Sequence, residues 1–205
     1  MANDWESLKC ELEDYAEKQG VPIIRGPERE LLLQAAGRAF PKRILEIGTA
    51  IGYSALLLAE RFPEADIDTV EVDEERHRLV EDCMKKAGLS ERVHCRLGDA
   101  GDIIPTLEGP YDFVFLDGPK GQYLRELKAI EPLLSDRAVI AADNVLFRGL
   151  VRGGDPIPHR YRTLVLRLRE YIDYVNRRYE TRIYVEGDGL AVSIKKKEES
   201  QESAD

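Results

Sequence analysis

The amino-acid sequence predicts an α/β fold, a three-layer sandwich in which helices cover both faces of a mostly parallel sheet. Short apolar runs alternate with amphipathic helical patterns along most of the 205 residues, as in parallel sheets with crossover helices. One short, mainly apolar run, Ile44 to Ile47, is followed by glycines and then by a helical pattern, which is typical of the first half of a βαβ unit. Near the carboxyl end, two strand patterns flank Glu186-Gly-Asp-Gly189 and predict a hairpin.

Composition indicates a single globular domain. A chain of 205 residues, 43% hydrophobic and 34% charged, is long enough to bury a full core. No apolar run approaches the ~20 residues of a membrane span. The first residues carry neither a basic start nor an apolar signal core, so we expect a cytoplasmic protein without membrane contact.

Charge and cysteines limit the function classes. The net charge of −9 and the pI of about 5.0 argue against indiscriminate nucleic-acid binding, although a local basic surface remains compatible with them. Cys10, Cys83 and Cys95 are odd in number and far apart. They predict reduced, mostly buried thiols and no zinc site.

The first part of the chain predicts two helices before the sheet begins. An apolar stripe predicts a helix over residues 4–19, and Gly20 is a suitable residue to end it. This helix precedes the sheet, so we expect it to cover one face of the domain or a partner subunit. Residues 21–24 read as an extended link, and a second amphipathic helix is predicted over residues 31–39.

The sheet follows in alternation with further helices. Strands are predicted at residues 44–47, 66–72, 92–97, 111–116 and 137–142, and helices at 55–60, 79–87 and 123–130. A loop rich in Gly and Pro over residues 147–158 precedes a long helix at 164–175 and the hairpin strands at 181–185 and 190–194. Residues 1–195 are therefore predicted to form one domain with an N-terminal helix, and the charged residues 196–205 a disordered tail.

The turn after the first strand indicates a ligand site. Gly48 and Gly52 allow a close approach of the backbone, and the free N–H groups of the next helix can hold polar ligand atoms. Their spacing is Gly-x-x-x-Gly, which disfavours the alternative of a nicotinamide-binding or non-catalytic nucleotide-binding module. Glu71 ends the second strand 23 residues after Gly48, where βαβ folds place an acid that binds ribose hydroxyls.

Acidic side chains also end the later strands. Asp99, Asp117, Asp143 and Asn144 follow predicted strands, and the carboxyl ends of parallel strands meet at one edge of the sheet. Asp117, Asp143 and Asn144 offer hard oxygen ligands that suit Mg²⁺, although Asp and Asn also cap helices. Lys120 lies on the same loop as Asp117 and is either a general base beside this site or an ordinary surface lysine.

Taken together, these motifs resemble the metal-dependent O-methyltransferases that use S-adenosylmethionine, the family of catechol and caffeoyl-CoA O-methyltransferases. The matching segments are Glu46-Ile-Gly48-Thr-Ala-Ile-Gly52-Tyr-Ser54, Glu71, Asp117-Gly-Pro-Lys120 and Asp143-Asn144-Val-Leu. The resemblance covers nearly the whole chain, from about residue 20 to residue 195. It implies a Rossmann-like methyltransferase fold with seven strands, the last of them antiparallel.

The resemblance also implies roles for individual residues. Cofactor contacts are expected from Ile24, Glu46, Gly48, Tyr53, Ser54, Glu71, Asp99, Ala100 and Asp117. Among them, Glu71 is expected at the ribose and Asp99 with Ala100 beside the adenine. Asp117, Asp143 and Asn144 match the ligands of Mg²⁺ or another divalent ion, and Lys120 matches the general base. A homodimer is expected as well.

Within the family, three further segments resemble the bacterial tRNA 5-hydroxyuridine methyltransferases, which make 5-methoxyuridine at the wobble base. They are Lys120-Gly-Gln-Tyr123, Asp143-Asn-Val-Leu-Phe-Arg-Gly-Leu-Val151 and Gly187-Asp-Gly-Leu-Ala191. Pro119 departs from this pattern, in which a small residue such as Ala is expected. The resemblance implies methyl transfer to 5-hydroxyuridine in a tRNA anticodon loop, and a small catechol-like phenol is the alternative substrate.

An arginine-rich segment bears on that choice. Residues 147–178 contain eight arginines against three acids in an otherwise acidic protein. Arg148 and Arg152 directly follow the Asp143-Asn144 loop, so we expect them to contact a substrate phosphate. The arginines between Arg167 and Arg178 are equally compatible with a solvated helix face.

Overall fold

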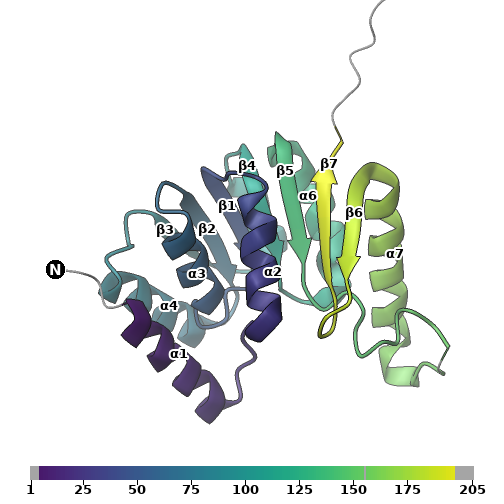
Figure 1. The fold of residues 1–205 in the computed structure, drawn as a ribbon, viewed down its shortest axis with the longest axis horizontal. Coiled ribbons are helices and arrows are strands. Elements are labelled where there is room, and N and C mark those ends of the chain that lie inside the picture. Colours follow the sequence, from purple (N-terminus) through teal and green to yellow (C-terminus); the bar gives the residue numbers. More distant parts are fainter. Residues whose placement is uncertain (1–4, 155, 197–205) are drawn as a thin grey trace, which may run out of the picture.

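The computed structural model describes residues 5–154 and 156–196, which fold around one seven-stranded sheet (Figure 1). The strand order is β3-β2-β1-β4-β5-β7-β6. The strands are β1 (Arg43–Ile47), β2 (Asp66–Glu71), β3 (Val93–Leu97), β4 (Tyr111–Leu116), β5 (Leu134–Ala142), β6 (Tyr179–Tyr184) and β7 (Leu190–Lys195). Pairing is parallel from β3 to β5, and β7 is antiparallel to both β5 and β6. The predicted α/β sandwich with its antiparallel last strand is confirmed.

Helices cover both faces of this sheet. One hydrophobic cluster contains side chains of α1 (Trp5–Gln19), α2 (Gly26–Gly37), α3 (Tyr53–Arg61) and α4 (Glu74–Lys86). The other contains side chains of α6 (Tyr123–Ile130) and α7 (Arg162–Arg178), with α5 (Ala100–Ile103) packed at its edge. Short 3₁₀ turns join several elements, among them η2 (Lys120–Gln122) directly after β4.

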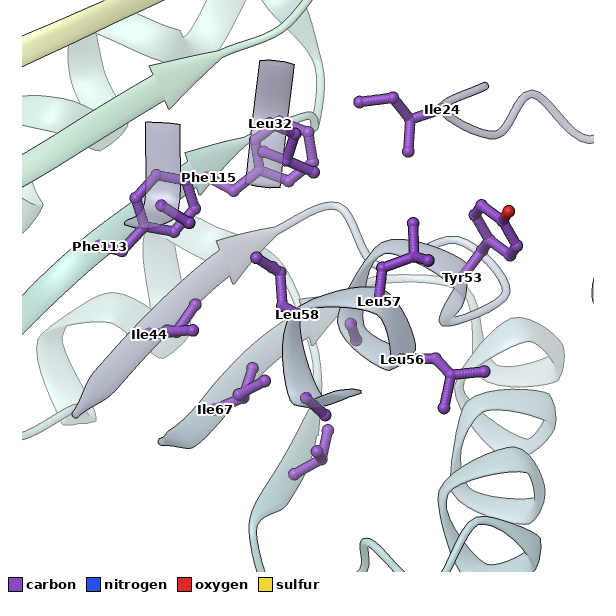
Figure 2. Close-up of a cluster of buried hydrophobic side chains, with 14 of the residues drawn as sticks. Ile24, Leu32, Ile44, Tyr53, Leu56, Leu57, Leu58, Ile67, Phe113 and Phe115 are labelled. Atoms are coloured by element: carbon purple, nitrogen blue, oxygen red, sulfur yellow. The ribbon is translucent and has the colours of Figure 1, made fainter. Parts of the chain in front are cut away.

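Alternation along the strands divides the core between the two faces. In β4, Phe113 and Phe115 belong to the cluster under α2 and α3, whereas Val114 belongs to the opposite cluster. Successive side chains of a strand point to opposite faces, so a strand buried on both sides is apolar throughout. Figure 2 shows Ile44, Ile67 and Phe113 from neighbouring strands on the same side of the sheet as the leucines of α3.

The first helix packs on its own domain. Leu8 and Ala16 of α1 are buried in the cluster that also holds α3. On the surface, the Lys9 ammonium donates to the Glu60 carboxylate at 2.9 Å. Of the two positions expected for this helix, the structure shows packing over one face of its own chain.

Several boundaries and one cysteine differ from the expectations. β2 ends at Glu71, and Val72, which was expected inside the strand, is 67% exposed. β5 begins at Leu134 and β6 at Tyr179, earlier than the sequence indicates, and the one-turn helix α5 was not expected. Cys83 is buried and Cys95 half-buried, but Cys10 is exposed, because it lies on the outer side of α1. The predicted tail falls outside the described residues from 197 onward.

Within the described residues, no helix is long and apolar enough to cross a membrane.

Candidate active site

The strand ends converge on a cavity of about 410 Å³, a size typical of small-molecule sites. It lies beyond the carboxyl ends of β1 to β5, where open α/β sheets bind ligands. The sequence-predicted residues that line it are Ile24, Gly48, Glu71, Asp99, Ala100, Asp117, Lys120, Asp143 and Asn144. The link between α1 and α2 contributes Pro22, Ile23 and Ile24 to its wall.

Gly48 permits the close contact that shapes the floor of the cavity. Its φ is +97°, and a Cβ atom there would lie 2.7 Å from the backbone carbon of Asp117 and from the backbone nitrogen of Gly118. Real Cβ atoms do not approach backbone this closely, and side chains other than glycine disfavour positive φ. The turn after β1 and the loop after β4 can therefore touch only because residue 48 has no side chain.

Glu71 is fixed in the cavity by backbone amides. One of its carboxylate oxygens accepts from the Ala50 N–H at 2.8 Å, and the other from the N–H groups of Val72 and Asp73 at 2.9 Å each. The side chain is 5% exposed. These bonds orient the carboxylate rigidly beside the Gly48 turn. Oε1 accepts two of them, whereas Oε2 accepts one and keeps a lone pair for a ligand hydroxyl.

Two carboxylates and one lysine meet at the ends of β4 and β5. These strands are neighbours in the sheet, and the Asp143 N–H donates to the Leu116 carbonyl at 3.0 Å. The Lys120 ammonium donates to Asp117 Oδ1 at 2.7 Å. Burial raises the pKa of both Asp117 and Asp143, and the charge of Asp117 raises the pKa of Asp143 further.

This pair of carboxylates fits a divalent cation. Two partly buried acids that repel each other favour a positive ion between them, and carboxylate and amide oxygens are the ligands that Mg²⁺ prefers. Asn144 directly follows Asp143 and supplies the amide oxygen. In the described part of the chain, no group of three or more His, Cys, Asp or Glu side chains could hold a metal, so a site here consists of Asp117, Asp143 and Asn144 with water.

Three residues with an expected cofactor role do not line the cavity. Glu46 is completely buried behind Thr69, whose hydroxyl donates to it, and Ser54 also hydrogen-bonds to it. Tyr53 points away from the site, and its hydroxyl joins Glu13 of α1 and Arg29 of α2. Their side chains thus support the Gly48 turn and the start of α3 from behind.

Arg148 and Arg152 are exposed on the loop after β5 and do not line the cavity. This loop is anchored to the hairpin turn, since the N–H groups of Val145 and Leu146 donate to the Gly189 and Asp188 carbonyls at 3.0 and 2.8 Å. Figure 1 shows the loop and the hairpin turn at the same end of the sheet.

Aromatic rings surround Arg148 on this loop. Its guanidinium carbon lies 5.7 Å from the ring centre of Tyr161, and Arg160 lies 4.6 Å from the same centre. The Phe147 ring meets the Tyr161 ring edge to face at 5.2 Å. We refer to Phe147, Arg148, Arg160 and Tyr161 as the loop cluster.

The later arginines have structural partners. Arg169 donates to the carbonyls of Val151 and Leu150 at 3.0 and 3.2 Å and so ties the loop to α7. Arg178 pairs with Glu131 at 3.4 Å, and Arg177 donates to the Asp173 carbonyl within its own helix.

Sequence reasoning missed several residues of the cavity wall. Arg76 from the start of α4, Glu28 of α2, Gln122 of η2 and Glu126 of α6 all line it. For Glu126 a signal was available, because it interrupts the apolar stripe formed by Tyr123, Leu127 and Ile130. A carboxylate on the buried face of a helix is uncommon without a partner or a function.

Comparison with known proteins identifies the family. Residues 18–196 match the model of an O-methyltransferase family. The chain belongs to this family. A probable O-methyltransferase of Mycobacterium tuberculosis is 34% identical over 160 residues, covering 72% of this chain and 69% of the relative. Bovine catechol O-methyltransferase is 30% identical over 158 residues, covering 73% of this chain and 58% of the relative. This chain is therefore an O-methyltransferase by family.

Solved structures agree with this assignment over a larger part of the chain. A putative caffeoyl-CoA O-methyltransferase from Staphylococcus aureus has a TM-score of 0.84 at 29% identity and covers 92% of each chain. A Podospora anserina methyltransferase bound to S-adenosylhomocysteine has a TM-score of 0.76 at 29% identity, covering 94% of this chain and 86% of its own. The fold expected from the resemblance, that of methyltransferases that use S-adenosylmethionine, is thus confirmed.

Proposed function

We propose that this O-methyltransferase moves a methyl group from S-adenosylmethionine to the 5-hydroxyl of 5-hydroxyuridine at the wobble position of a tRNA anticodon, giving 5-methoxyuridine with the help of a divalent metal ion such as Mg²⁺. The observation that carries the proposal is a single cavity with two different ends. Glu71, Asp99 and Ala100 line one end, and Asp117, Lys120, Asp143 and Asn144 line the other. The Gly48 turn lies between them, against the Asp117 backbone. Such a cavity can hold a methyl donor and an acceptor oxygen side by side.

The cofactor end positions the donor. Glu71 is held by three backbone N–H groups, and its Oε2 atom presents the remaining lone pair to a ribose hydroxyl. Gly48 allows the methionine part to lie against the backbone of the turn. The loop after β4, which touches Gly48 through Asp117 and Gly118, would then lie beside the bound donor.

The acceptor end activates the hydroxyl. A divalent ion held by Asp117, Asp143 and Asn144 supplies Lewis acidity, which lowers the pKa of a hydroxyl bound beside it. Lys120 lies within hydrogen-bond reach of Asp117, and as a neutral amine it is placed to receive the hydroxyl proton. The deprotonated oxygen forms the new O–C bond as the S–C bond breaks, and the electron pair of that bond stays on sulfur.

The choice between tRNA and a small phenol depends on the residues around the cavity. A 5-hydroxyl beside a ring carbonyl and a catechol both offer two neighbouring oxygens, so the acceptor end accommodates either. The loop cluster favours the nucleic acid, because cations interleaved with partly buried rings suit phosphates and unstacked bases. Its anchoring to the hairpin turn by Val145 and Leu146 keeps it near Asn144. A tRNA substrate also accords with a cytoplasmic enzyme.

A transfer assay with labelled S-adenosylmethionine separates the two substrates. Purified tRNA that lacks the modification and a simple catechol are offered in parallel, each with Mg²⁺ and with a chelator. We expect label in the tRNA only when Mg²⁺ is present. Label in the catechol with none in the tRNA would reject the tRNA proposal and favour the small-phenol alternative. Equal transfer with Mg²⁺ and with the chelator would reject the proposed metal dependence.

A matched pair of variants tests the loop cluster. Arg148→Gln removes the charge between Phe147 and Tyr161, whereas Arg182→Gln removes an equally exposed charge from β6. We expect Arg148→Gln to raise the KM for tRNA severalfold, because roughly one phosphate contact is lost, and Arg182→Gln to leave it unchanged. An equal effect of both variants would show that only overall charge matters.

The homodimer expected from the sequence belongs to the same proposal. Sedimentation equilibrium of the full chain tests it directly, and a single species with the mass of one chain would reject it.

A further inference from the structure

The side chain of Glu126 lies on the buried face of α6 and lines the cavity. It is 2% exposed, and its Oε2 atom has no hydrogen-bond partner among the described residues. A buried carboxylate oxygen without a partner is costly, because the water it has lost is not replaced. Such a group in a ligand cavity points to a partner that the ligand itself supplies.

The neighbours of Glu126 indicate which part of a bound ligand it contacts. Burial raises the pKa of Glu126, and the charge of Asp99 raises it further. The neighbouring Arg125 pairs with Asp99 at 3.4 Å. Asp99 also caps α5 by accepting from the Gly101 N–H at 2.8 Å. Glu126 therefore lies close to Asp99, which follows β3.

A nucleoside whose ribose hydroxyls bind Glu71 extends in two directions. Its 5′ substituent runs toward the Gly48 turn and the Asp117 end, so its base occupies the opposite end, beside Asp99 and Ala100. That end is walled by α5 and α6, which pack against each other. Glu126 is a buried acid in that wall.

We propose that Glu126 binds the adenine of the methyl donor by hydrogen bonds to its 6-amino group and N1. This rests on S-adenosylmethionine as the cofactor in the proposed function and is independent of the tRNA substrate. The 6-amino group is a donor and N1 an acceptor. A carboxyl group accepts from the first through its carbonyl oxygen and, when protonated, donates to the second. The otherwise unpartnered oxygen is then satisfied by the ligand.

The environment of the carboxyl supports this pairing. Burial raises the pKa of Glu126 to about 7, although the positive charge of Arg125 acts in the opposite direction. Near neutral pH a substantial share of the molecules thus carries the protonated carboxyl that can make both bonds. Glutamine has the same arrangement of one acceptor and one donor at every pH, so Glu126→Gln is the conservative variant. Glu126→Leu removes both functions while keeping an apolar side chain of similar size.

Calorimetry with S-adenosylhomocysteine tests the proposal without any need for turnover. We expect Glu126→Leu to weaken binding by about tenfold or more and Glu126→Gln by less than about threefold, since the loss reflects unmade hydrogen bonds. Glu180→Gln, which removes an exposed acid from β6, serves as the control and is expected to bind like the wild type. Equal binding by wild type and Glu126→Leu would overturn the assignment.

A second ligand distinguishes a direct contact from a structural role. In an analogue of S-adenosylhomocysteine whose adenine is replaced by unsubstituted purine, the 6-amino group is absent. We expect the wild type to bind this analogue several times more weakly than the parent compound, and Glu126→Leu to bind both alike. Thermal unfolding of the ligand-free variants completes the test, with Glu126→Leu expected to melt no lower than wild type because a buried unpartnered acid is gone.

The outcomes distinguish a failure of the proposed cofactor from a failure of the adenine contact. If the wild type does not bind S-adenosylhomocysteine, the proposed cofactor fails. If the wild type binds it but both ligands lose the same affinity in Glu126→Leu, or the melting temperature of that variant falls together with its affinity, Glu126 acts through the fold and the adenine contact is refuted.

Discussion

Replacing Glu46 with glutamine removes a titratable carboxyl group from the core of the domain. Burial raises the pKa of Glu46 from 4.5 to about 7, against the hydrogen bonds of Ser54 and Thr69 that favour its charged form. One of its oxygens, Oε1, is buried without a partner among the described residues. Glu46 is completely buried, so solvent screening is small and the pKa difference translates into stability.

The sign and size follow from proton linkage. Between about pH 4.5 and about pH 7 the folded protein keeps a proton on Glu46 that the unfolded chain releases, so the free energy of unfolding falls as the pH rises. Each unit of pKa difference corresponds to about 1.4 kcal/mol, which gives a loss of about 3 kcal/mol across this window. Above the folded pKa both states are ionised, and this contribution no longer changes with pH.

Urea unfolding of wild type and Glu46→Gln, in chelator and from about pH 4.5 to about pH 8.5, measures the effect. Glutamine keeps an acceptor for Thr69 but does not titrate, and all other groups are common to both proteins. We expect the stability of wild type relative to the variant to fall by about 3 kcal/mol over this range. A difference that is constant with pH would refute the buried, titrating carboxyl. Glu180→Gln, an exposed exchange, controls for net charge.

Three further substitutions test the site. Gly48→Ala is expected to destabilise the fold by about 1–3 kcal/mol from positive φ alone. It is also expected to abolish S-adenosylhomocysteine binding in calorimetry, since its Cβ would overlap the Asp117 backbone. Full binding would refute the close contact. Lys120→Ala is expected to lower kcat by about 10²-fold or more with little change in KM, and a change confined to KM would argue against a proton acceptor. Asp143→Ala is expected to abolish Mg²⁺-dependent transfer while S-adenosylhomocysteine still binds, and undiminished turnover would remove the metal from the proposal.

Much of the site was predictable because of one property of parallel sheets. The carboxyl ends of successive parallel strands meet at one edge, so acids that end strands come together whatever the details of the packing. Gly48, Glu71, Asp117 and Asp143 line one cavity for this reason. Glu46 and Tyr53 do not line this cavity, because a residue beside a motif can point to either face of its element.

The chain by itself determined the order of strands and helices, the glycine turn and the acids at the strand ends, since these depend on local pattern and on the direction of the strands. Only the tertiary structure decided which side chains face the cavity and which are shielded behind it. Glu46 is closed off by Thr69 of β2, Arg169 of α7 anchors the loop after β5, and Glu126 is turned inward where α6 meets α5. Each of these contacts joins residues far apart in sequence, and it forms only when helices and strands pack in three dimensions.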